Sequence, residues 1–380
     1  DTFTGKMLDT KDVSTHLEKM RPYREWLREN SVRVQGSPEL EEYLCDQGLK
    51  GDDLKASQKM FMVTFEERDQ LLRPIAESGQ EAVGSMGDDT PMAVLSRQVR
   101  HVSDYFRQQF AQVTNPPIDP LRESIVMSLE TCLGREQNVF EQGPDHADRL
   151  IISSPVLSNS KMHLLRTLVR EGYGQAEIDL NYPESEGLGV AVKRICEESA
   201  QAIRDGKSIL ILSDKNIREG YLPANSVLVT GAVHHYLIQQ GLRTDANIIV
   251  ETGVARGPHQ FAVLLGFGAT AIYPYLAHDV INDLVAKGEL LGDPIQAQAN
   301  FRKGIDKGLL KVLSKMGIST VASYRGGQLF EAVGLSKEVV DTCFIGVPSR
   351  IEGATFADLE NDQKKLADLA WKARKPIDQG

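Results

Sequence analysis

From about residue 146 onward, short apolar runs rich in β-branched residues alternate with stretches of helical periodicity. Helical stretches that end at glycine separate most of these runs, for example 226–240 before Gly241 and 301–316 before Gly317. This alternation predicts parallel strands joined by right-handed helical crossovers. The strands are almost wholly apolar, which predicts a sheet buried on both faces. The runs with strand character are 150–152, 176–180, 208–212, 247–250, 270–273, 318–322 and 342–345.

About seven such units fit either a doubly wound sheet or a (β/α)8 barrel that lacks part of its circle. The number of units approaches eight, and no dinucleotide-binding fingerprint opens the first of them. We therefore expect an α/β fold, a rudimentary or incomplete TIM-like (β/α)8 barrel, over residues 146–350.

Residues 1–145 show a different pattern of charged and apolar residues. Charged and apolar residues interleave at helical spacing over 10–29 and 65–72, and Trp26 and Leu27 lie on a face that packing could cover. We expect a mostly helical N-terminal module over 1–145, followed by the β/α repeat over 146–350 and a connector over 351–380.

Two segments of the N-terminal module are punctuated by proline and aspartate. In Gly87-Asp88-Asp89-Thr90-Pro91, Thr90 can cap a helix that starts at Pro91 and runs through Leu95. In 114–120, the double proline forces an extended run, and Asp119-Pro120 predicts a helix over 121–133. Both segments are expected to form stiff loops with polar edges.

The composition narrows the classes of protein to consider. The 380 residues include 43 Lys and Arg against 53 Asp and Glu, a net charge of −10, which argues against a nucleic-acid binder. No apolar run approaches the roughly 20 residues of a membrane span, and no secretory signal opens the chain. The four cysteines show no metal-binding or redox spacing, so we expect reduced thiols in a cytoplasmic compartment. The chain opens on Asp1 rather than Met, which suggests a piece of a longer polypeptide.

Two strings imitate nucleotide-binding loops. Gly266-Phe267-Gly268 opens a G-x-G-x-x-A match, but it follows a helical stretch and precedes a strand, the reverse of the order that a pyrophosphate site requires. Gly206-Lys207-Ser208 resembles the end of a P-loop, yet it also precedes a strand. We interpret the first string as a helix-ending turn and the second as the surface entry to a strand.

Polar residues follow several of the predicted strands at their carboxyl ends, where a barrel carries its chemistry. Asp214, Lys215, Glu251 and Arg325 could gather there as a charged cluster. One interpretation is a site for a substrate anion beside Lys215 or Arg325. The alternative, which we favour, is a network of ion pairs that caps the sheet.

Several long strings resemble one family. They occur in the family's order, and the resemblance is to the central domain of the glutamate synthase large subunit, most like the bacterial NADPH type. The strings are Asp1-Thr2-Phe3-Thr4-Gly5-Lys6, 87–91, 110–123, 266–276, Ser314-Lys315-Met316-Gly317-Ile318-Ser319-Thr320 and 329–335.

This resemblance implies one piece of a multidomain oxidoreductase of glutamate biosynthesis and ammonia assimilation. In the family, an amidotransferase domain releases ammonia from glutamine, and an FMN domain of the same chain reduces the 2-iminoglutarate formed with 2-oxoglutarate. The central domain links the two and helps to line the ammonia tunnel. For the whole enzyme the resemblance implies FMN, an iron–sulfur cluster, and NADPH through a small subunit.

For this chain itself the resemblance implies neither catalysis nor a cofactor or metal. The candidate residues for the tunnel wall are Thr90 and its neighbour Asp89, together with Thr114 and Asn115. Thr90 is equally explained as a helix cap. Two alternatives stay open at this point. The chain could be a self-sufficient barrel enzyme or phosphoanion-binding protein using Asp214, Lys215, Glu251 and Arg325, or a structural spacer without a tunnel role.

Overall fold

A computed structural model of the chain describes residues 1–81, 92–109 and 124–372. Its centre is a parallel sheet of four strands in the order β10-β9-β7-β5. Neighbouring strands are also successive β/α units, with Leu210 of β7 paired to Ala176 of β5 and Ile248 of β9. The strands are β5 (Gly174–Asp179), β7 (Lys207–Ser213), β9 (Asn247–Glu251) and β10 (Ala271–Tyr273).

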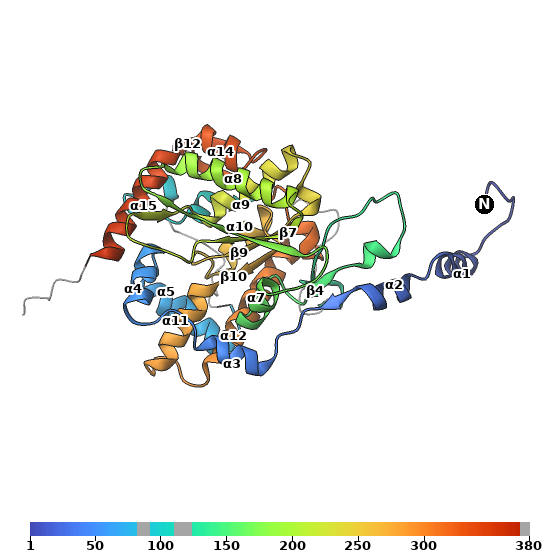
Figure 1. Cartoon of the computed structure of the whole chain (residues 1–380), viewed down its shortest axis with the longest axis horizontal. Coiled ribbons are helices and arrows are strands. Elements are labelled where there is room, and N and C mark those ends of the chain that lie inside the picture. The colour runs from blue at the N-terminus through green and yellow to red at the C-terminus, as the bar shows by residue number, and fades with distance from the viewer. Residues whose placement is uncertain (82–91, 110–123, 373–380) are drawn as a thin grey trace, which may run out of the picture.

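Both faces of this sheet are covered. Leu210, Leu212 and Val250 belong to the main core, which includes α8 (Leu188–Arg204), α9 (Ser226–Gln239) and α10 (Pro258–Gly266). Ile209, Ile211 and Ile249 on the other face pack in a second core with α7 (Asn159–Arg166). Figure 1 shows α8 and α9 above the sheet and α7 below it. A complete barrel keeps its helices outside the strands, so α7 occupies the face that closed strands would enclose.

The sheet stays open within the described part of the chain. Beyond β10 it gains only a single parallel bridge, between Val156 and Ile272. After β10 the repeat gives way to helices, α11 (Tyr275–Ala286) and the long α12 (Pro294–Lys315). The α/β fold is therefore confirmed as a β/α repeat that does not close into a barrel over the residues described.

Five of the predicted strands are confirmed, at 150–152, 176–180, 208–212, 247–250 and 270–273. The prediction at 342–345 is wrong, because 337–343 form α14 (Lys337–Cys343), capped by the Ser336 side chain. The prediction at 318–322 is also wrong. That segment makes one bridge, from Thr320 to Ser128, before α13 (Val321–Tyr324) begins.

The predicted helix over 121–133 is wrong where the chain is described. Residues 124–126 form one short 3₁₀ turn, and 131–133 form a strand, β3 (Thr131–Leu133). This strand pairs antiparallel with β4 (Leu150–Ile152), which in turn pairs with β1 (Val32–Arg33). The pairing buries Leu133 completely, so a tertiary partner overrides the local signal at Asp119-Pro120.

Two further small sheets connect distant parts of the chain. β2 (Phe106–Gln108) pairs antiparallel with β11 (Phe330–Leu335), whose other neighbour is β12 (Ser349–Ala354). β6 (Asn181–Pro183) pairs antiparallel with β8 (Tyr221–Pro223).

The two strings that imitate nucleotide-binding loops lie where the sequence predicts. Gly268 has a φ of 112° in the turn between α10 and β10, and Lys207 is exposed at the start of β7.

The helices between residues 38 and 78 pack on the body of the molecule. α4 contacts α11 and α15 (Phe356–Trp371), and α6 contacts α12. The helices of this part are α3 (Pro38–Cys45), α4 (Gly51–Met60), α5 (Phe65–Glu67), the π-helical turn η1 (Arg68–Leu72) and α6 (Arg73–Ser78). The predicted helical periodicity over 65–72 is thereby confirmed.

A buried carboxylate fastens α3 to α7. Glu41, 7% exposed, accepts hydrogen bonds from the backbone N–H groups of Asn159 (3.2 Å) and Ser160 (3.0 Å) in the first turn of α7. Those N–H groups have no partner within the helix, and the positive end of the helix dipole favours an anion. The hydrogen bonds to Ser160 lower the pKa of Glu41 against the opposing effect of its burial.

The first thirty residues form an arm that extends away from the rest of the molecule (Figure 1). It consists of α1 (Thr10–Met20) and α2 (Tyr23–Asn30), and neither helix contains a buried residue. Trp26 is half-buried, whereas Leu27 is 55% exposed, so packing covers only part of the face predicted for them. No helix in the described part of the chain has the length and apolar character needed to cross a membrane.

Substitution of Gly231 in α9 tests how closely this helix packs against α14, and Gly189 in α8 provides the control. A Cβ at Gly231 would lie 2.2 Å from the carbonyl oxygen of Cys343, so Gly231→Ala is expected to destabilise the fold by about 1–3 kcal/mol. A Cβ at Gly189 in α8 would meet Phe356 at an ordinary 3.5 Å. Gly189→Ala is therefore expected to be neutral or to stabilise by up to about 1 kcal/mol. Urea unfolding measures both, and equal effects would contradict the close approach.

Candidate functional site

Asp214 lies directly beyond the carboxyl end of β7 and is fully buried. One carboxylate oxygen accepts from the backbone N–H of Gly253 (2.9 Å) and the other from the hydroxyl of Thr252 (2.5 Å). Thr252 is in turn hydrogen-bonded to the Ser226 hydroxyl at the start of α9 (2.9 Å). Burial raises the pKa of Asp214 to about 7, although these hydrogen bonds oppose the shift.

Glu251 ends the neighbouring strand β9 and is 1% exposed. Its Oε2 accepts from the Arg166 guanidinium of α7 (2.7 Å) and from the Ser213 hydroxyl (2.6 Å). β7 and β9 pair in register at Ser213 and Glu251, which explains why residues 38 positions apart in the chain meet at one edge of the sheet. The ion pair links the sheet to the helix on its second face.

Lys215 completes the group at this edge. Its ammonium lies 5.6 Å from the ring centroid of Tyr275, at the start of α11. Burial raises the pKa of nearby Asp279 to about 6, and both the backbone N–H of Leu49 and the charge of Lys215 oppose that shift. The structure thus brings Asp214, Lys215 and Glu251 together, as the sequence predicts.

Arg325 lies elsewhere. Gly326 donates its backbone N–H to the carbonyl of Gly266, where α10 ends beside the amino end of β10 (3.1 Å). Burial lowers the pKa of the Arg325 guanidinium, an effect that Glu136 and Cys132 oppose. Its placement follows from the missing strand at 318–322, because without that strand Arg325 does not follow a carboxyl end.

The carboxylates of this group are sealed from solvent, whereas Lys215 is half-buried. Asp214 and Thr252 have no exposed surface and Glu251 has 1%, so a diffusing substrate cannot reach the carboxylates in this conformation. Both oxygens of Asp214 and Oε2 of Glu251 accept hydrogen bonds from neighbouring elements, whereas Glu251 Oε1 is buried without a partner among the described residues. This geometry agrees with the interpretation as a polar cap on the sheet.

A second buried polar group lies in the loop after β9. Arg256 is completely buried, pairs with Glu67 of α5 (2.7 Å), donates to the carbonyl of Gly253, and hydrogen-bonds His101 Nε2 (3.1 Å). Burial, together with the charges of Arg256 and Arg100, lowers the pKa of His101 to about 3, so its imidazole is neutral at physiological pH. The sequence analysis missed this group, although the loop after a predicted strand end is where such residues were sought.

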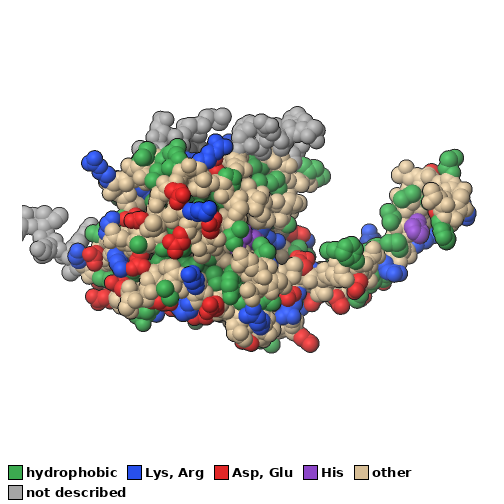
Figure 2. All heavy atoms as spheres, turned by 90° about the horizontal axis from the view of Figure 1, so that it is seen from above, with side chains coloured by type: hydrophobic (Ala, Val, Ile, Leu, Met, Phe, Trp, Pro, Cys, Tyr) green, Lys and Arg blue, Asp and Glu red, His purple; other side chains and the backbone are tan. Residues whose placement is uncertain are grey.

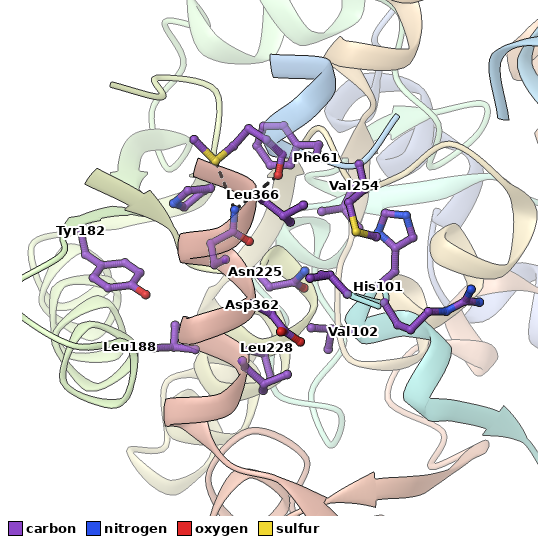
Figure 3. A pocket seen from close by; sticks show the side chains of 17 residues that line it. Phe61, His101, Val102, Tyr182, Leu188, Asn225, Leu228, Val254, Asp362 and Leu366 are labelled. Atoms are coloured by element: carbon purple, nitrogen blue, oxygen red, sulfur yellow. Dashed lines mark hydrogen bonds between the residues drawn. The ribbon is translucent and has the colours of Figure 1, made fainter. Parts of the chain in front are cut away.

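His101 borders two adjacent spaces. A cavity of about 50 Å³ is lined by Phe61, Tyr182, Asn225, Val254 and Asp362 among others (Figure 3). A groove of about 1050 Å³ lies between α4, residues 97–104 and α15. The residues that line both are Met62, Val99, Arg100, His101 and Leu366. The groove therefore adjoins a cavity large enough for water-sized molecules.

The predicted tunnel residues Asp89, Thr90, Thr114 and Asn115 lie outside the described residues. Over the part of the chain that the structure describes, no three His, Cys, Asp or Glu side chains gather as ligands for a metal ion. The four cysteines are unpaired thiols, three of them buried in α3, α8 and α14. They do not fit an iron–sulfur cluster.

These observations define a β/α-repeat domain whose strand-end polar groups are sealed and bonded to the scaffold. A family model described as the glutamate synthase central domain matches residues 56–336, and this chain belongs to that family. It is 40% identical to the glutamate synthase [NADPH] large chain of Bacillus subtilis over 96% of this chain and 24% of that protein. Against the glutamate synthase [NADH] of Saccharomyces cerevisiae the identity is 37%, over 99% of this chain and 18% of the relative.

A third relative, the chloroplastic ferredoxin-dependent glutamate synthase of Oryza sativa subsp. japonica, is 38% identical over 94% of this chain and 23% of its own length. The chain thus spans about a fifth to a quarter of the relatives it matches. Similar identities to NADH, NADPH and ferredoxin types do not single out one electron donor. Among solved structures, the flavin-binding domain of baker's yeast flavocytochrome b2 is 16% identical over 42% of this chain and 38% of that chain, with a TM-score of 0.31.

Proposed function

We propose that this chain acts as the central domain of a larger glutamate synthase, where it connects the amidotransferase and FMN domains and lines part of the ammonia path between them. The family match over 56–336 carries this proposal. The sealed strand-end network supports a scaffold rather than a separate catalytic centre. The proposed division of the chain is 1–145, 146–350 and 351–380.

The whole enzyme would carry FMN, an iron–sulfur cluster and NADPH, the last through a small subunit, outside this chain. The buried free thiols Cys45, Cys196 and Cys343 support a reducing, cytoplasmic compartment. We expect the isolated chain to be colourless and without glutaminase activity. Flavin bound in a one-to-one ratio, measured by visible absorbance, would overturn the scaffold assignment.

The cavity beside His101 suits a passage for ammonia. It has room for water-sized molecules, and the low pKa of His101 leaves a neutral imidazole that does not deliver a proton to ammonia at neutral pH. Thr90, Asp89, Thr114 and Asn115 remain our candidates for other parts of the wall.

Thr90→Leu in the full-length synthase tests whether Thr90 lines the ammonia passage. The added bulk is expected to uncouple the two reactions, so that glutamine hydrolysed per glutamate formed rises several-fold above the wild-type ratio. Thr90→Val is the matched control because it keeps the side-chain volume and also removes the hydroxyl that we expect to cap a helix. Coupling that stays unchanged in Thr90→Leu, or that is lost equally in both variants, would contradict the tunnel role of Thr90.

A further inference from the structure

The arm of residues 1–30 carries an unusual amount of exposed apolar surface. Phe3 and Met7 are each 97% exposed, and Leu17 is 51% exposed although it lies within a helix. Hydrophobic side chains can be seen along the arm in Figure 2. The exposed large apolar residues of the arm are Phe3, Met7, Leu8, Val13, Leu17, Met20, Tyr23 and Leu27.

These residues are arranged, not scattered. Val13, Leu17 and Met20 are spaced four and three residues apart, which places them in one stripe along α1. Charged residues such as Lys11 and Glu18 occupy the opposite side of the helix. The stripe has the pattern of a helix that buries one face against a partner.

The helix is well started but short. Asp9 and Asp12 form a reciprocal capping box at its beginning, yet α1 has only 11 residues. A helix of this length is marginal in water, and most helical stability in proteins comes from packing of an apolar face. Since no residue of α1 is buried, that packing must come from outside the described structure.

A second exposed apolar area lies where the arm joins the body. A cavity of about 280 Å³ opens between α2 and residues 141–147, lined by Tyr23, Trp26 and Leu27. The Tyr23 hydroxyl donates to the Gln142 side chain (2.9 Å), which holds α2 in place. Beside it, Phe140 is 94% exposed. Exposed apolar side chains concentrated in one part of a molecule usually mark an interaction site.

We propose that the arm is a docking element, whose apolar stripe on α1 is covered by another domain of the same synthase polypeptide. This inference rests on the proposed function. The chain corresponds to only 18–24% of its relatives, so most of the polypeptide available to cover the stripe lies outside this structure. An apolar stripe fits an apolar groove on that partner, in the helix-in-groove mode.

Hydrogen–deuterium exchange on the full-length synthase tests the proposal. A synthetic peptide of residues 9–21 supplies the unprotected exchange rate. The α1 amides of the wild-type synthase are expected to exchange at least about a hundred-fold more slowly than those of the peptide. The double substitution Val13→Asp with Leu17→Asp is expected to return them close to the peptide rate. Ser14→Asp with Thr15→Asp adds the same two charges off the stripe and should keep most of the protection.

Three outcomes would overturn the proposal: α1 amides that exchange at the peptide rate in the wild type, equal loss of protection in both double variants, or protection that rises with protein concentration. The last would assign the stripe to a second copy of the chain. This experiment is separable from the tunnel test. Protected α1 amides with unchanged coupling in Thr90→Leu would leave the docking proposal standing and remove only the tunnel role.

Discussion

Arg256→Met is expected to lower the free energy of unfolding by about 3–5 kcal/mol. The variant removes a cation that is completely buried and leaves Glu67, with 15% of its side chain exposed, without its partner. It also deprives the Gly253 carbonyl and His101 Nε2 of a donor. A buried carboxylate left unpaired costs far more than the pair contributes, which is why truncating one partner has such a large effect. Urea unfolding of the chain measures the change.

The control for this variant is Arg33→Met. Arg33 and Glu130 form a similarly short pair, 2.8 Å against 2.7 Å, but their side chains are 58% and 40% exposed. We expect a loss below about 1 kcal/mol for that pair. Adding Glu67→Gln to Arg256→Met should restore part of the stability, because the unpaired charge is then gone. A loss in Arg256→Met as small as that of the control would contradict the structural role of the pair.

The stability of the chain is expected to depend on pH through Asp214. The pKa of this carboxyl is about 7 in the folded protein and near its ordinary 3.8 when unfolded. The folded state therefore binds the proton more tightly, so the contribution of Asp214 is complete below pH 4 and is lost as the pH rises to 7. The loss is on the order of 4 kcal/mol.

Asp214→Asn removes this titration while keeping the shape of the side chain. The difference in the free energy of unfolding between Asp214→Asn and the wild type is expected to shift in favour of the variant as the pH rises from 4.5 to 8. Urea unfolding at both pH values measures it. Asp205→Asn, a change to an exposed aspartate, should keep the wild-type pH dependence. A parallel pH dependence in Asp214→Asn and the wild type would contradict the assignment.

The central sheet could be predicted because the signals for its strands and helices lie within short stretches of the sequence. Each buried parallel strand is a nearly continuous apolar run, and α9 and α12 end at glycine signals that the sequence displays. The prediction at 342–345 was wrong because Thr342 and Cys343 end a helix whose capping serine, Ser336, lies several residues upstream, and Phe344 and Ile345 follow that end. A window that starts at Thr342 contains the strand-favouring residues Thr342, Phe344 and Ile345 and misses the cap.

Only part of the candidate site could be predicted from the sequence. Asp214 and Glu251 follow neighbouring strands of one sheet, so the topology alone brings them together. Arg256 and Glu67 are 189 residues apart, and no periodicity or motif marks their pairing. Such a contact depends on how α5 packs against the repeat, which is decided by tertiary structure. The prediction for Arg325 failed for a different reason. It depended on a strand at 318–322 that does not form, so Arg325 was expected at the wrong edge of the sheet.

The pairing of β2 with β11 has a consequence for synthesis of the chain. β7, β9 and β10 each pair with the preceding β/α unit, so their contacts can form soon after they leave the ribosome. Over the described residues, β2 pairs with no strand that precedes it in the chain. Gln108 is 216 residues from Tyr324, to whose hydroxyl it donates (3.1 Å), and β11 is made later still. Until then the nascent polypeptide carries an unpaired strand, an exposed edge that chaperones can hold and that other nascent chains can join.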